Sequence, residues 1–176
     1  MTTRKLIAVC IIAAAASLSL YAAEEPKKSG GATDERVAKI DDYVRGVEAK
    51  RSSLTRKEAM LDPQSLANAT DEKWSKVHVY SDGDKLARVK VYPTEGSRKT
   101  EEFYYDNDKL AFVFIEPDGV GKENHDADAK GTKYYFASGR IFAMSTNGKV
   151  TPPDDQARAM GEKLQRESKA FRAAAK

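Results

Sequence analysis

Residues 100–115 have the sequence TEEFYYDNDKLAFVFI, and this stretch decides the fold. Aromatic residues lead into the polar turn Asp106-Asn107-Asp108, and every position of 110–115 is apolar. Aromatic and β-branched residues favour strands, while Asp and Asn tolerate the backbone angles of tight turns. A strand that is apolar on both faces is normally central and covered on both sides. We therefore predict a hairpin whose second strand is covered by helices on one face and by a loop, a second chain or a ligand on the other.

The same hairpin pattern recurs on either side of this stretch. In each copy a tyrosine lies five residues before a basic residue that is followed by Leu or Ile: Tyr80 before Lys85-Leu86, Tyr104 before Lys109-Leu110, and Tyr135 before Arg140-Ile141. The tyrosine ends the incoming strand, and the aliphatic residue opens the return strand on the buried face. The copies predict six strands, at residues 77–79, 86–92, 100–105, 110–115, 132–136 and 140–145.

Helical patterns flank these strands. Apolar residues recur at spacings of three and four within 37–47, and a second apolar stripe runs through 157–171 after a helix-start signal at 151–154. Pro63 should break the segment between the first helix and the strands into short pieces and a loop. The predicted fold is α+β: an antiparallel β-meander of about six strands, with the N- and C-terminal helices packed on one face.

The N-terminus has the order of a secretory signal peptide. Arg4 and Lys5 precede an apolar run of about 15 residues, which is shorter than the roughly 20 that a membrane span needs. Cleavage is expected near Ala22-Ala23. We predict a signal peptide at 1–23, a flexible linker at 24–32 and a single domain at 33–176. The mature protein would be periplasmic or secreted, with no stable membrane anchor after cleavage.

Cleavage would also change the composition of the chain. Cys10 is the single cysteine and would leave with the signal, so the mature domain would have no disulfide. The formal net charge is +3, from 30 Lys and Arg against 27 Asp and Glu, and loss of Arg4 and Lys5 reduces it to +1. A nearly neutral chain with mixed charges gives no case for nucleic-acid binding, which needs a clustered basic face.

One loop is rich in ligands for hard metal ions: Asp118, Glu123, His125, Asp126 and Asp128. The stretch that begins at Asp126 starts like a calcium loop but has Lys130 at its fifth position and Ala137 at its twelfth, where a bidentate glutamate is needed. These residues are weak metal candidates, and we assign no metal, no cofactor and no catalytic residue.

Aromatic residues in the strands are the remaining signal. An exposed aromatic sheet face could stack on sugars or peptides, although cross-strand packing explains the same residues. The possible binding surface comprises Tyr104, Tyr105, Phe112, Phe114, Tyr134 and Tyr135.

The chain resembles a group of uncharacterised exported bacterial proteins with repeated hairpins of the type Tyr-Tyr-Phe-Asp-Asn-Gly-Lys-Leu between two helices. The matching stretches are 79–86, 104–110 and 134–141, with Asp108 in place of the turn glycine and Ala137-Ser138 in place of Asp-Asn. The resemblance implies the same fold and compartment, and it brings no catalytic residue.

Three functions stay open from the sequence. The first is a non-catalytic periplasmic or secreted binding or accessory module, whose partner is an envelope protein or a cell-wall component. The second is a metal-dependent or hydrolytic envelope enzyme that uses the 118–128 loop. The third is an inhibitor or immunity-type protein that acts on an envelope enzyme.

Overall fold

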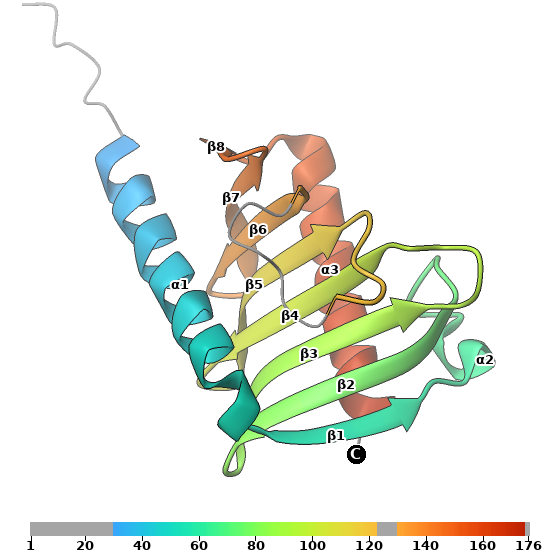
Figure 1. The fold of residues 1–176 in the computed structure, drawn as a ribbon. Coiled ribbons are helices and arrows are strands. Elements are labelled where there is room, and N and C mark those ends of the chain that lie inside the picture. The colour runs from blue at the N-terminus through green and yellow to red at the C-terminus, as the bar shows by residue number, and fades with distance from the viewer. Residues whose placement is uncertain (1–29, 123–129, 175–176) are drawn as a thin grey trace, which may run out of the picture.

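The computed structural model describes residues 30–122 and 130–174. The predicted signal peptide, with Cys10, and residues 24–29 of the predicted linker lie outside these ranges. The elements in chain order are α1 (Gly30–Lys50), the 3-10 helix η1 (Arg51–Ser53), β1 (Thr55–Met60), α2 (Pro63–Leu66), β2 (Trp74–Asp82), β3 (Lys85–Pro93), β4 (Thr100–Asp106), β5 (Lys109–Glu116), β6 (Thr132–Ala137), β7 (Arg140–Thr146), β8 (Lys149–Thr151) and α3 (Asp155–Ala174) (Figure 1).

The described strands form one open antiparallel sheet of eight strands, in the order β1 to β8. The α+β class and the meander are thus confirmed, but the predicted number of strands was too small. β1 was missed because its centre is the charged run Arg56, Lys57 and Glu58, which gives no apolar face. Such a sequence suits an edge strand, and five of its six residues are exposed. β8 has three residues, too few to produce a periodic pattern.

The turns between paired strands use the residues that the sequence pattern indicated. Asn107 and Asp108 both have positive φ, 48° and 61°, and join β4 to β5. This geometry suits the right-handed twist of a hairpin and explains how Asp108 replaces a turn glycine. Ser138 and Gly139 adopt the same region between β6 and β7, with φ of 50° and 74°.

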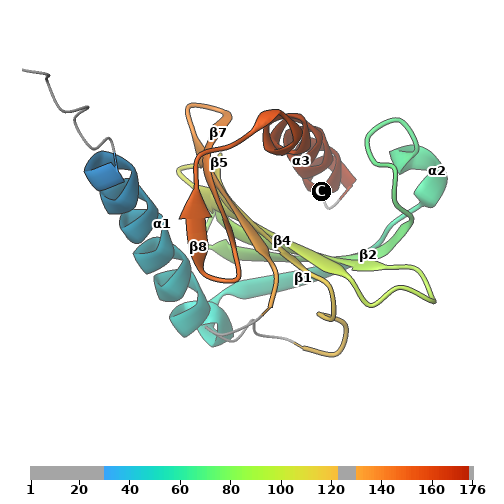
Figure 2. The same ribbon diagram turned by 90° about the horizontal axis from the view of Figure 1, so that it is seen from above.

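The two long helices lie on opposite faces of the sheet (Figure 2), so their predicted packing on one face was wrong. Val37, Val44 and Val47 of α1 pack in one cluster of buried residues. Leu164 and Phe171 of α3 pack in the other. Strand residues alternate between the two clusters, because successive side chains in a strand point to opposite faces.

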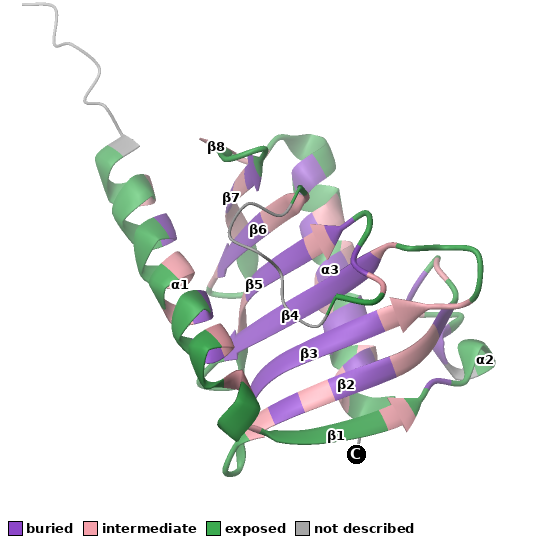
Figure 3. Cartoon of the chain, viewed as in Figure 1, coloured by how far each residue is buried: buried purple, intermediate pink, exposed green. Residues whose placement is uncertain are grey.

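This arrangement answers which element covers the second face of the apolar strand. In β5, Val113 packs with the α3 cluster, while Phe112 and Phe114 pack with the α1 cluster. The central strands are buried along most of their length and β1 is exposed (Figure 3). The chain therefore covers its own central strand with α1 on one face and α3 on the other.

Two helix boundaries differ from the sequence prediction. α1 begins at Gly30, so residues 30–32, assigned to the linker, are helical. Pro63 does not merely interrupt a helix but starts the short helix α2, where the side chain of Asp62 accepts a hydrogen bond from the backbone N–H of Gln64 at 3.0 Å. Within the described residues, no helix is both long and apolar enough to cross a membrane.

Gly131 provides a test of how closely the chain packs on β5. A Cβ atom at this position would lie 2.4 Å from the backbone oxygen of Ile115 and 2.5 Å from the ring of Phe114. Gly131→Ala should therefore lower the free energy of unfolding by about 1–3 kcal/mol, measured by urea denaturation.

Gly46→Ala is the matched control for this substitution. A Cβ at Gly46, inside α1, meets nothing within 4 Å. This variant should gain up to about 1 kcal/mol from helix propensity. Equal stability of the two variants would contradict the packing of Gly131 against β5.

Candidate functional site: a pocket between α1 and two hairpin turns

The six aromatic residues of the predicted binding surface are buried by the chain itself. Tyr104, Phe112, Phe114 and Tyr135 belong to the α1 cluster, and Tyr105 and Tyr134 belong to the α3 cluster. Tyr134, the most exposed of them, keeps 8% of its surface accessible. They form no exposed face, so the predicted binding surface was wrong. The sequence indicated that both faces of the strand are apolar, but it did not indicate that a helix covers each face.

The buried tyrosines instead tie the helices to the sheet. Burial raises the pKa of their hydroxyls, which stay protonated at neutral pH. The contacts are Tyr104 to Glu48 of α1 at 3.0 Å, Tyr135 to Asp41 of α1 at 3.1 Å, and Tyr105 to Ser168 of α3 at 2.8 Å. Each helix is thus positioned by hydrogen bonds as well as by apolar contact.

The predicted metal loop is described only at its start. Asp118 is exposed and pairs with Arg98, and this hydrogen bond lowers the pKa of Asp118. Glu123, His125, Asp126 and Asp128 lie outside the described residues. Within the described part of the chain, no three His, Asp or Glu side chains stand close enough together to hold a metal ion.

His78 is buried on the α1 face of the sheet, and both of its ring nitrogens have partners. Nε2 lies 2.8 Å from a carboxylate oxygen of Glu58, and Nδ1 lies 3.2 Å from the hydroxyl of Tyr92. Burial lowers the pKa of His78, so the neutral ring donates to Glu58 and accepts from Tyr92. These two contacts hold the His78 ring in one tautomer and one orientation.

A network of buried charges lies on the same sheet face. Glu102 accepts from Arg88 at 2.8 Å and contacts the ammonium of Lys90 at 2.7 Å, and all three side chains are fully buried. Glu48 of α1 approaches Arg88 to 3.3 Å. These charges occupy positions in β3 and β4 that alternate with valine and phenylalanine, a pattern that sequence alone assigns to a solvated face. These charged groups pair with one another inside the protein, and the contact of Glu48 with Arg88 helps to position α1.

A second buried charge cluster lies under α3. Glu101 of β4 and Glu167 of α3 keep 1% and 0% of their surface accessible. Burial, followed by the charge of Glu167, raises the pKa of Glu101 to about 8, against the opposing effect of Lys99 at 3.1 Å. Burial also raises the pKa of Glu167. The two carboxyls therefore do not both ionise at neutral pH.

The arrangement that best fits a ligand is a pocket of about 330 Å³ between α1 and the ends of two hairpins. Its size lies at the lower end of the range for small-molecule sites. The lining residues are Tyr43, Gly46, Val47 and Lys50 of α1, Leu54, then Asp82, Lys85, Leu86 and Ala87 of the first hairpin, and Tyr105, Asp106 and Asn107 at the second turn.

The pocket has an apolar floor and a charged rim. Val47 and Ala87 are buried, with Leu54 and Leu86 half-buried beside them. The exposed rim carries two lysines, Lys50 and Lys85, and two aspartates, Asp82 and Asp106. Apolar walls with a few polar groups at the edge are the usual composition of a ligand pocket.

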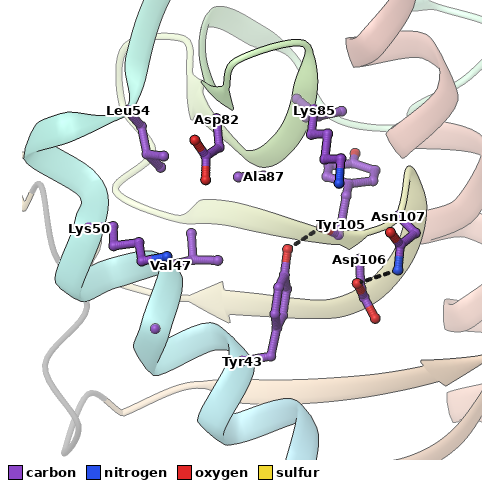
Figure 4. Close-up of a pocket in the computed structure, with 12 residues that line it drawn as sticks. Tyr43, Val47, Lys50, Leu54, Asp82, Lys85, Ala87, Tyr105, Asp106 and Asn107 are labelled. Atoms are coloured by element: carbon purple, nitrogen blue, oxygen red, sulfur yellow. Dashed lines mark hydrogen bonds between the residues drawn. The ribbon is translucent and has the colours of Figure 1, made fainter.

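Local hydrogen bonds hold the pocket in shape. Figure 4 shows Tyr43 reaching from α1 toward the sheet, where its hydroxyl donates to the backbone oxygen of Tyr105. Burial and the nearby charge of Asp106 raise the pKa of Tyr43, which keeps the hydroxyl a donor. At the turn, the Asn107 amide donates to Asp106 at 2.9 Å.

The pocket was not predicted from the sequence, although Gly46 could have indicated it. Gly46 lies inside α1, where glycine weakens a helix by about 1 kcal/mol relative to alanine. Gly46 is exposed and lines the pocket, and a Cβ there would meet nothing within 4 Å. A helix-weakening glycine without a packing reason is the signal that could have drawn attention to this site.

Comparison with known proteins gives no relative: no family model, no curated protein and no solved structure matches the chain.

The buried carboxyl pair predicts a specific pH dependence of stability. The unfolded chain releases the Glu101 proton near its ordinary pKa of 4.5, whereas the folded protein holds it up to about 8. Folded protein therefore binds more protons across this window, and the contribution to stability falls as pH rises from 4.5 to 8. Glu101→Gln should remove most of this loss, making the variant more stable than wild type by about 2–4 kcal/mol at pH 8.

The measurement is chemical denaturation of both proteins at several pH values. Glu95→Gln, an exposed loop substitution with the same change in charge, serves as the control and should leave the pH profile unchanged. A stability difference between Glu101→Gln and wild type that stays constant from pH 4.5 to 8 would show that the pair is not strained.

Proposed function

We propose that this protein is an exported, non-catalytic binding module of the periplasm or the cell exterior, and that the pocket between α1 and the two hairpin turns is its ligand site. The main support for this proposal is the pocket, which has an apolar floor and a charged rim. Gly46 of α1 leaves space there that a side chain would occupy.

The rim chemistry favours a ligand with both signs of charge. Lys50 and Lys85 balance Asp82 and Asp106, so the lining carries no net charge. A short peptide with an apolar side chain offers an ammonium, a carboxylate and an apolar body that match this rim and floor. Cell-wall peptides and exposed peptide ends of envelope proteins are the two sources of such a ligand.

A binding role, rather than catalysis, fits the chemistry of the described lining residues. They supply hydrogen-bonding and charged groups from three separate segments, which is enough to orient a ligand. They do not place a serine or cysteine nucleophile beside a histidine base, the pairing that acyl-transfer chemistry uses.

Gly46→Leu tests the site by filling it. The new side chain enters open space, so the fold should be retained and helix propensity should rise. We expect wild-type protein to bind members of a set of short zwitterionic peptides in saturation-transfer NMR, and Gly46→Leu to weaken that binding at least about tenfold through loss of the buried apolar contact.

Gly31→Leu is the matched control. It makes the same substitution in the same helix, also into open space, but away from the pocket. This variant should bind like wild type. Unchanged binding by Gly46→Leu, or no peptide binding by wild type, would reject the proposal.

A further inference from the structure

A second concave site lies on the opposite face of the sheet, between α3 and the β6–β7 hairpin. Its volume is about 560 Å³. The lining residues are Gly139, Arg140 and Ile141 of the hairpin and Arg158, Gly161, Glu162, Gln165, Arg166 and Lys169 of α3. This groove shares no lining residue with the α1 pocket.

Two glycines shape the groove. A Cβ at Gly161 would lie 2.9 Å from Cγ2 of Ile141, so glycine is what lets α3 approach β7 this closely. Gly139, in the turn, has a φ of 74° that L side chains rarely adopt. Gly161 thus fixes the close contact between α3 and β7 at the base of the groove, and Gly139 adds no side chain at its edge.

The charge of the groove lining is unbalanced. Four bases and one acid, Glu162, leave the lining with a net charge of +3. Arg158 pairs with Asp155 at 2.6 Å. Arg140, Arg166 and Lys169 form no ion pair with a carboxylate in residues 30–122 and 130–174.

We propose that this groove binds a soluble phosphorylated compound through its phosphate or pyrophosphate group. A lining charge of +3 is matched by a group with two or three negative charges, which a single carboxylate does not supply. The planar guanidinium of arginine binds two phosphate oxygens at once. Gln165, a half-buried lining residue, adds an amide donor. The concave shape accommodates a discrete group rather than a flat membrane surface. Because the groove and the α1 pocket share no residue, binding here does not depend on the function proposed for that pocket.

The test uses pyrophosphate as the probe, in calorimetric titrations of the mature protein at low ionic strength, where charge interactions are least screened. Wild type should bind. Arg166→Gln should weaken binding roughly tenfold, since hydrogen bonds to charged groups are strong. Glu162→Gln should strengthen binding several-fold, because it removes the one negative charge of the lining. Both side chains are exposed, so the fold is preserved.

Arg45→Gln, on α1 and exposed, is the matched control for the loss of one positive charge and should leave the affinity unchanged. Opposite effects of the two groove substitutions would support the site. No binding by wild type, or equal losses in Arg45→Gln and Arg166→Gln, would overturn it.

Vesicles with an anionic phospholipid distinguish the source of the phosphate. We expect pyrophosphate to bind without measurable association of the protein with such vesicles. Vesicle binding that pyrophosphate does not compete with would overturn the assignment to a soluble ligand.

Discussion

The fold depends on one constraint: both faces of a single sheet must be covered, one by α1 and the other by α3. Because adjacent residues of a strand point to opposite faces, each central strand must supply apolar side chains to two separate clusters. Phe103 and Tyr104 illustrate the division: Phe103 packs toward α3 and Tyr104 toward α1. A slip of one residue in strand pairing would exchange the two sets of side chains, so the register of the whole meander is specified at once.

Buried charges add to this specification at a cost in desolvation. Lys90 and Glu102 are directly paired across β3 and β4, and the Glu102 carboxylate also receives Arg88. Any other register would leave these charges buried without partners. Glu101, one position away in β4, points to the other face and meets Glu167 of α3. Neighbouring glutamates therefore have opposite roles: Glu102 is neutralised by bases, and Glu101 keeps its proton near neutral pH.

Much of the fold could be predicted from local patterns, and the misses have physical causes. Residues 104–110 and 134–141 carry their turn geometry in their own residues, so their hairpins were predictable. The side of the sheet on which α1 packs depends on how a short connection crosses the sheet edge, which no local pattern encodes. β1 has no apolar face to produce a period of two. The pocket arises where α1 meets the turns at Asp82 and Asp106, residues far apart in the chain, and Gly46 alone hinted at it.

The placement of the two helices on opposite faces buries the aromatic strands, and it leaves the pocket at α1 and the groove at α3 as separate sites. Nuclear Overhauser contacts between side chains test it most directly. We predict that the methyl groups of Val37, Val44 and Val47 contact the rings of Tyr104, Phe112 or Tyr135, while those of Leu164 contact Phe103 or Phe136. Contacts from the α1 valines to Phe103 or Phe136 would place both helices on one face and contradict it.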